Sequence, residues 1–444
     1  MGHVGTPPLF VPVRADQAFP DPLFDRLFPP LPTATHWSLE RTENALGDLG
    51  DPHRNYPSIH VGGTNGKGSV SSTISSVLTE RGLKVACYTS PHLISFRERL
   101  LINGSPLPEA TLLEYAGQVR ASVMRFGLTF FEAITVLAMY AFAKEGVQVL
   151  AAEVGLGGRL DATNVLRPEV AAVTNVAKDH SYYLGETVLE IAREKAGIMK
   201  PGVPFVTTET SEDLKALFEQ LAAEVGAPLV FVDRERVSRV KVNKRATSFY
   251  TKTAKWGELK LVTPLVGSHQ ATNTSLAVAV LEELPNSLIP EANDVISGIS
   301  KVKYRGRADI RVIEGLTWIF DVAHNPAGMR SFTETLGQIH SPGPLVGLVS
   351  ILSDKDWKTM LPILLTRLDM VILTRAPSLS DQEFWDPQSA AEEIPVDLHV
   401  EVEEDFTQAL QKAVKLAGNG SVIATGSVHT VGSAMRLLGL DPLS

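Results

Sequence analysis

Cysteine is almost absent from this 444-residue chain, because Cys87 is the only one. A lone cysteine cannot form an internal disulfide, which fits a reducing compartment, so we expect a cytoplasmic protein with Cys87 as core filler. Long apolar runs are also missing, and none reaches the ~18–20 residues of a membrane span. The best candidate, ITVLAMYAFA, is flanked by Glu132 and Lys144 and is predicted to be a buried helix. The start of the chain lacks the pattern of a secretory signal.

An excess of basic residues is lacking as well, since the net charge is −9. Sequence-independent binding to nucleic acid needs a basic face, so we expect neither a nucleic-acid nor a membrane partner. The chain has 44% hydrophobic and 20% charged residues, as ordinary globular proteins do. Its length suggests two or three domains.

Apolar β-branched runs alternate with helical patterns along most of the chain, which is typical of an α/β fold with a parallel sheet. The predicted strands lie at SIHVGG, KVACYTS, 147–155, 170–177, 204–209 and 228–233, and the predicted helices at 69–81, 130–145, 187–199 and 212–225. After Asp233 the pattern changes to polar/apolar alternation, which favours antiparallel hairpins. A new strand and helix series begins near 302–310. We therefore predict a peripheral or poorly ordered extension over 1–38, a first α/β domain over 39–305 and a smaller α/β domain over 306–444.

The stretch IHVGGTNGKGSV joins the first strand to the first helix, where a phosphate-binding loop belongs. It departs from the usual Gly-x-x-x-x-Gly-Lys-Ser/Thr pattern, because Gly68 separates Lys67 from Ser69. Gly63, Gly66 and Gly68 allow the backbone to approach an anion closely. A helix start at Ser69 adds a positive dipole end, and Lys67 adds a mobile charge. A tight connection is the alternative interpretation.

Polar side chains follow the predicted strands at the edge where ligands of open α/β sheets collect. They are Ser90, Glu153, Asp179 and His180. Together they predict a magnesium site beside the phosphates, although spacing alone cannot show that they meet. His180 could equally be an ordinary loop histidine. The glycine-rich segment 155–164 could be a flexible loop, and Lys195 has no distinguishing feature of its own.

Nine segments, taken in order, resemble the folylpolyglutamate synthases and bifunctional dihydrofolate synthases, a branch of the Mur ligase superfamily. The similarity runs from about Leu39 to Leu438 and is carried by HVGGTNGKGSV, YTSPHLISFRERL, TFFEAITVLAMYAF, EVGLGGRLDATN, TNVAKDHSYYLGETVLEIAREKAGIMK, LVGSHQATNTSLA, YRGRADI, FDVAHNPAGMRSF and TGSVHTVG. The nucleotide loop of this family is Gly-Thr-Asn-Gly-Lys-Gly-Ser/Thr, which Gly63 to Ser69 reproduce in full. Three segments depart from the family pattern: Gly62 stands where Ala is common, DHSYYLG replaces DHTEYLG, and YRGR replaces Trp-Pro-Gly-Arg, so that Arg305 could alter the hinge.

The resemblance implies a P-loop, Mur-ligase-type ATP-binding domain and a Rossmann-like C-terminal glutamate-ligase domain. It also implies roles for individual residues. ATP would be bound by Gly63, Thr64, Asn65, Gly66, Lys67, Gly68, Ser69, Asn273, Arg307, Asp321 and His324. Two magnesium ions would be held with help from Ser90, Glu153 and His180, with Lys67, His180 and a carbamylated Lys195 as catalytic groups. The pteridine or pteroate pocket would be lined by Phe131, Glu132, Leu160, Asp161 and Ala162.

The activity implied by the resemblance is ATP-dependent addition of L-glutamate to dihydropteroate, to reduced folates, or to both, through an acyl phosphate. We expect a monomer that acts on small molecules, with a monovalent cation as a further cofactor to test. A Mur-type ligase for a peptidoglycan precursor is an alternative, but its usual UDP-binding domain has no room before residue 59. A P-loop GTPase is a second alternative, but NVAKD has the wrong spacing for an Asn-Lys-x-Asp guanine reader. A nucleotide-binding protein without catalysis is a third.

Overall fold

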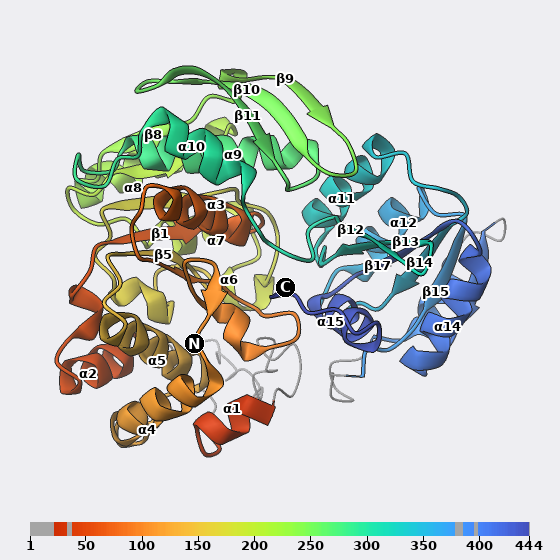
Figure 1. The fold of residues 1–444 in the computed structure, drawn as a ribbon, viewed down its shortest axis with the longest axis horizontal. Helices are drawn as coiled ribbons and strands as arrows, with labels where there is room; N and C mark the ends of the chain where they lie inside the picture. The colour runs from red at the N-terminus through yellow and green to blue at the C-terminus, as the bar shows by residue number, and fades with distance from the viewer. Residues whose placement is uncertain (1–21, 33–37, 378–384, 395–397, 444) are drawn as a thin grey trace, which may run out of the picture.

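The computed structural model describes residues 22–32, 38–377, 385–394 and 398–443 (Figure 1). The remaining residues, including most of the predicted extension over 1–38, lie outside the described part. Two α/β units lie side by side, and a three-stranded sheet lies beside the helices of the first (Figure 1). Within the described ranges, no helix is both long and apolar enough to cross a bilayer.

The first unit is built on an eight-stranded sheet in the order β4-β3-β2-β5-β1-β6-β7-β8. Six strands run parallel, and β3 and β4 add an antiparallel edge. The strands are β1 (Ser58–Gly62), β2 (Val85–Tyr88), β3 (Leu100–Ile102), β4 (Ser105–Pro106), β5 (Val149–Glu153), β6 (Val170–Val173), β7 (Phe205–Thr207) and β8 (Leu229–Phe231). Because β1 lies between β5 and β6, the ends of these strands are neighbours in space.

Helices cover both faces of this sheet, which explains its continuous apolar strands. In β5, Val149 and Ala151 pack in the cluster with α3 and α9, while Leu150 and Ala152 pack in the cluster with α4 and α5. The helices of this unit are α1 (Pro22–Leu27), α2 (Glu40–Asp48), α3 (Lys67–Glu80), α4 (Glu109–Arg125), α5 (Phe130–Lys144), α6 (Ser181–Leu184), α7 (Val188–Ala196), α8 (Glu212–Val225), α9 (Ser268–Glu282) and α10 (Ala292–Ser300).

The predicted antiparallel hairpins after Asp233 are confirmed. They form the sheet β11-β10-β9, made of β9 (Val237–Val242), β10 (Thr247–Thr253) and β11 (Gly257–Thr263). Alternate side chains of β10 and β11, such as Phe249 and Leu261, join the core formed with α9. The opposite face carries charge, which accounts for the alternation in the sequence.

The second unit has a six-stranded sheet in the order β12-β13-β17-β14-β15-β16, parallel except for the edge strand β12. Its strands are β12 (Asp309–Ile313), β13 (Leu316–Asp321), β14 (Leu345–Val349), β15 (Met370–Leu373), β16 (His399–Val402) and β17 (Ser421–Thr425). Its helices are α11 (Pro326–Gln338), α12 (Trp357–Leu365), α13 (Pro387–Glu392), α14 (Phe406–Ala417) and α15 (Val428–Leu437). The predicted fold class, a parallel-sheet domain followed by a smaller α/β domain, is confirmed.

One local expectation needs correction. Helix α3 begins at Lys67 rather than Ser69, because Gly66 has a φ of 86° and ends the loop immediately before Lys67. A part of the predicted N-terminal extension lies within the described residues. Helix α1 lies at the edge of the domain (Figure 1), but Leu27 and Phe28 are buried in the core shared with α4 and α5.

Candidate active site

The glycine-rich loop 63–66 is tied to the end of the neighbouring strand β6. The backbone N–H of Thr64 donates to the carbonyl of Asn175 at 2.8 Å, and the N–H of Asn65 donates to the Asn175 side-chain oxygen at 3.2 Å. The carbonyl of Asn65 accepts hydrogen bonds from Thr174 Oγ1 and Asn175 Nδ2. The loop conformation is therefore set by β6 as well as by its own glycines.

Each of three glycines in the loop has a neighbour where a side chain would sit. A Cβ on Gly63 would lie 1.9 Å from Thr174 Oγ1, and one on Gly68 would lie 2.0 Å from Tyr304 Oη. Gly66 has a left-handed φ of 86°, and a Cβ there would lie 2.6 Å from Asn273 Oδ1. Backbone conformation and close packing both require glycine at 63 and 66, whereas close packing against Tyr304 alone requires it at 68.

The start of α3 supplies the donors for an anion. The first intrahelical bond runs from Val70 N–H to the Gly66 carbonyl, so the preceding amides of Lys67, Gly68 and Ser69 lie at the open end of the helix. Lys67 Nζ folds back and donates to the carbonyls of Gly63 and Thr64 at 3.2 and 3.1 Å. The Oγ of Ser69 is buried without a hydrogen-bond partner in the described part of the chain.

Glu153, at the end of β5, is a buried carboxylate beside this loop. Its Oε2 accepts a hydrogen bond from Ser90 N–H at 3.1 Å, so the structure brings these two predicted metal-site residues together. Burial raises the pKa of Glu153, and the charge of Lys67 and the Ser90 hydrogen bond offset this only in part. A divalent cation would satisfy such a carboxylate.

The donor set here fits magnesium better than a metal held by protein alone. Among the described residues, no group of three or more His, Cys, Asp or Glu side chains is placed to hold a metal. Mg²⁺ is commonly bound by one or two carboxylates together with phosphate oxygens and water. Glu153 and the unpaired hydroxyl of Ser69 suit that arrangement.

His180 lies apart from Glu153 in its contacts, and its nearest charged neighbour is Asp179. It begins α6 with a left-handed φ of 51°, held by its N–H donating to Asp179 Oδ1 at 2.9 Å. Burial lowers the pKa of His180 to about 3, so its imidazole is neutral. A neutral ring is the ligand form of histidine. Its role at the metal stays a prediction.

Lys195, near the end of α7, is buried and reaches the glycine loop. Its Nζ donates to the Gly63 carbonyl at 2.9 Å. Burial and the nearby charge of Lys67 lower the pKa of Lys195 to about 7. A lysine that was unremarkable in the sequence is thus a buried amine, largely uncharged above neutral pH, beside the phosphate loop.

Four more predicted nucleotide-binding residues come from α9, the linker and the second unit, namely Asn273, Arg307, Asp321 and His324. Asn273 packs against Gly66, and Arg307 is half-buried with its guanidinium 5.6 Å from the Tyr304 ring centroid. Asp321 ends β13 and accepts hydrogen bonds from Ala308 N–H and Ala323 N–H. Burial raises the pKa of Asp321 to about 6, although Arg307 and the two N–H donors counteract it.

The predicted pteroate pocket divides into groups with different environments. The Phe131 ring lies where a Cβ on Gly155 would be, so these two residues are in close contact. The Glu132 carboxylate accepts hydrogen bonds from Thr129 at the start of α5 and forms an ion pair with Arg41 at 2.8 Å. That carboxylate already has its partners within the protein.

Asp161 has a similar structural role in the segment 155–164. Its side chain accepts from the N–H groups of Leu156 and Thr163, at 2.8 and 3.0 Å, and caps a short 3-10 helix over Ala162–Val165. Burial raises the pKa of Asp161. Segment 155–164 is therefore an ordered turn rather than a flexible loop, and Leu160 within it is partly exposed. Substrate contacts by Leu160, Asp161 and Ala162 stay predictions.

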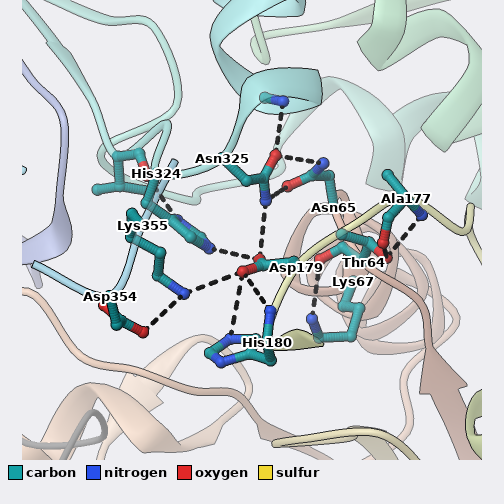
Figure 2. Close-up of polar contacts among 12 residues, drawn as sticks. Thr64, Asn65, Lys67, Ala177, Asp179, His180, His324, Asn325, Asp354 and Lys355 are labelled. Carbon is teal, nitrogen blue, oxygen red and sulfur yellow. Dashed lines mark hydrogen bonds and ion pairs between the residues drawn. The ribbon is translucent and has the colours of Figure 1, made fainter. Parts of the chain in front are cut away.

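Asn175, Asn325 and Lys355 are not among the predicted site residues, although all three make contacts in the site. Asn325 and Lys355 belong to the second unit and reach Asp179 and Asn65 of the first (Figure 2). The signal for Asn325 was present in the FDVAHNPAG segment, directly after His324. Lys355 lies in an ordinary charged stretch, SDKDWK, and only the fold shows where it points.

Two family models match this chain, the Mur ligase middle domain over residues 61–281 and the Mur ligase glutamate ligase domain over residues 306–428. Folylpolyglutamate synthase of Lacticaseibacillus casei is 32% identical over 404 residues, covering 88% of this chain and 92% of that protein. Dihydrofolate synthase/folylpolyglutamate synthase of Mycobacterium tuberculosis is 33% identical and covers 91% of each chain. The chain belongs to the folylpolyglutamate synthase and dihydrofolate synthase family.

Solved structures of this synthase family share the whole architecture. The Mycobacterium tuberculosis folylpolyglutamate synthase complexed with ADP has a TM-score of 0.86 at 30% identity, covering 95% of this chain and 97% of that one. The Escherichia coli protein FolC, in complex with DHPP and ADP, has a TM-score of 0.80 at 30% identity and covers 94% and 96%. The predicted ligase class and two-domain Mur ligase fold are thereby confirmed for this family member.

Proposed function

We propose that this protein joins L-glutamate to dihydropteroate, to reduced folates, or to both, using ATP and an acyl phosphate. The observation that carries the proposal is the loop 63–69, which brings Lys67 beside buried Glu153 within a chain matching the synthases along its length. Family relatives with ADP, and one with DHPP, support these ligand classes. We place the ATP-binding domain at 39–305 and the glutamate-ligase domain at 306–444.

The proposed chemistry assigns a task to each part of the site. The amides at the start of α3 and the Lys67 ammonium bind the ATP phosphates and spread the charge of the transferred group. The substrate carboxylate attacks the γ-phosphorus, ADP leaves, and the amine of glutamate then displaces phosphate to form the amide. Asp321 and His324 approach from the second domain, and the two domains together exclude the water that would hydrolyse the acyl phosphate.

Magnesium and the carbamate of Lys195 are parts of this proposal. When bound, magnesium would offset the negative charge of the phosphates, held by Glu153 with Ser90, His180 and the Ser69 hydroxyl as candidate neighbours. For carbamylation, the neutral Lys195 amine forms a nitrogen–carbon bond to CO2 and loses a proton. The lowered pKa of Lys195 supports this reaction. A monovalent cation, a monomeric state and a cytoplasmic location are proposed with it.

Glutamate-dependent ADP release tests the function directly. The assay compares dihydropteroate, tetrahydrofolate and a UDP-muramyl peptide as acceptors with wild type, Lys67→Ala and Glu153→Gln. We expect turnover with one or both folate acids and a loss of at least ~100-fold in each variant. Turnover with the UDP-muramyl peptide alone would instead assign the protein to peptidoglycan synthesis. Near-normal rates in the variants would remove Lys67 and Glu153 from the mechanism.

A further inference from the structure

We propose that Lys355 and Asn325 are positioning residues that lock the second domain onto the phosphate loop through Asp179 and Asn65. These four residues are called the Asp179 latch below. Figure 2 shows Asp179 at the centre, with Lys355 and Asn325 of the C-terminal domain pointing toward it. None of the nucleotide, metal or folate roles proposed above includes Lys355 or Asn325. Only the kinetic part of this inference rests on the proposed function.

The Asp179 carboxylate joins the two domains with both of its oxygens. Oδ1 accepts from Lys355 Nζ at 2.9 Å and Oδ2 from Asn325 Nδ2 at 2.9 Å, while His324 Nε2 lies 3.3 Å from Oδ2. The side chains of Asp179 and Lys355 are only 7% and 6% exposed. The other acid near Lys355 is Asp354, which is farther at 3.6 Å and half-exposed.

Asn325 connects the same carboxylate to the phosphate loop. Its Oδ1 accepts from Gly328 N–H at 2.8 Å and so caps α11, which fixes the orientation of the amide. The amide then forms a reciprocal pair with Asn65: Asn65 Nδ2 donates to Asn325 Oδ1 at 3.1 Å, and Asn325 Nδ2 donates to Asn65 Oδ1 at 3.0 Å. The helix cap of one domain thereby holds a side chain of the other domain's phosphate loop.

These contacts connect the second domain to two parts of the site, the phosphate loop and His180. Asn65 belongs to the loop that precedes Lys67, and Asp179 Oδ1 also accepts from the backbone N–H of His180. Lys355 lies between β14 and α12, so it meets Asp179 only when the second domain is seated. Removing one partner of a buried, hydrogen-bonded ion pair destabilises the protein, because the remaining charge is buried without compensation. We infer that the latch holds the loop and His180 in their working positions.

Hydrogen exchange, followed by mass spectrometry with AMPPCP and magnesium, tests the latch without any turnover. The variants are Lys355→Met and Lys355→Arg. The control is Lys358→Met, three residues away, which removes an exposed ion pair with Glu393. For Lys355→Met we expect exchange of the amides over 63–68 and 174–180 to rise at least ~10-fold, with partial recovery in Lys355→Arg. We expect Lys358→Met to change the exchange of these amides less than ~2-fold. Equal exchange in Lys355→Met and Lys358→Met would overturn the proposal.

If Lys355→Met lowers the overall stability, exchange would rise for that reason alone. A double-mutant cycle with Asp179→Asn then separates this effect from loss of the Lys355–Asp179 ion pair. The two substitutions remove the same ion pair, so their effects on exchange should be strongly non-additive. Additive effects would show that Lys355 does not act through Asp179 and would refute the proposal.

The kinetic readout separates positioning from general destabilisation. We expect kcat/KM for glutamate to fall at least ~10-fold in Lys355→Met, while the Kd of AMPPCP changes less than ~3-fold. Equal losses in both quantities would contradict a positioning role. If no folate acid supports turnover in wild type, the proposed function fails, whereas the exchange results still decide the latch.

Discussion

Replacement of Lys195 by Ala should remove the proposed carbamate as well as the side chain. The pKa of Lys195 is about 7, so about half of the amine is neutral at pH 7. An ordinary lysine with a pKa of 10.5 would have about 1 in 3,000 molecules neutral at that pH. The burial of Lys195 therefore increases the form that reacts with CO2 by about three orders of magnitude, which is the physical basis for expecting a carbamate here.

The assay combines spectroscopy with turnover. With ¹³C-labelled bicarbonate, wild type should show a carbamate resonance that Lys195→Ala lacks. Glutamate-dependent ADP release should fall at least ~100-fold in Lys195→Ala and recover in part with acetate, which supplies a carboxylate in place of the carbamate. Lys200→Ala is a matched control. Lys200 follows Lys195 by five residues, but it donates to the Asn164 carbonyl rather than to the phosphate loop. It should retain both the resonance and the activity.

The pH dependence gives an independent check with a defined sign. The reactive form of Lys195 is the deprotonated amine, so carbamate formation at constant CO2 rises with pH through about 7. Lowering the pH from 7 to 6 reduces the neutral fraction from about a half to about a tenth, so the initial rate at which the resonance grows should fall about five-fold. The final intensity should not exceed that at pH 7, because carbamate formation also releases a proton. Full activity of Lys195→Ala without added carboxylate, or a resonance that survives the substitution, would refute the reasoning.

Three other predictions concern packing and charge. Gly68→Ala should destabilise the fold by about 1–3 kcal/mol because its Cβ would collide with the Tyr304 hydroxyl, and adding Tyr304→Ala should restore part of the loss in thermal unfolding. Cys87 should react with thiol reagents only after denaturation, because burial and nearby Glu153 raise its pKa to about 12; labelling of the native protein would contradict its buried position. Asp179→Asn should lower the free energy of unfolding by about 3 kcal/mol at pH 7. Burial alone would raise the Asp179 pKa, but the His324 hydrogen bond and adjacent positive charges hold it well below 3.8, so wild type should lose this advantage as the pH falls below about 4. A difference that stays constant down to pH 2 would exclude that origin.

Much of the first sheet follows from the sequence because its strands are buried on both faces. Runs such as VLAAE and VAAV are continuous apolar segments, and their lengths between turn residues predict β5 and β6. The strands β3 and β4 were missed, since they have only three and two residues and lie at the antiparallel edge of the sheet. Helix α10 was missed for a related reason: only nine residues long, it buries Val295, Gly298 and Ile299 while its other face is polar.

Some residues of the candidate site can be predicted from their residue type and local sequence, whereas others are recognised only in the folded structure. Lys67 and the glycines around it are identifiable because a strand–loop–helix context gives their residue types a meaning. Lys195 and Lys355 are not, because an exposed and a buried lysine look the same in a sequence. Their environments come from strands and helices far away in the chain, here Gly63 for Lys195 and Asp179 for Lys355.

The linker and the C-terminal domain contact the phosphate loop from two directions. The linker places Tyr304 against Gly68 at the start of α3, where any larger residue would collide. Across the domain interface, Asn325 pairs with Asn65 at the other end of the loop. Because the loop has contacts at both ends, its conformation depends on the position of the second domain. The extra glycine at 68 is then the space that the linker tyrosine occupies, and these contacts couple the loop conformation to the position of the second domain.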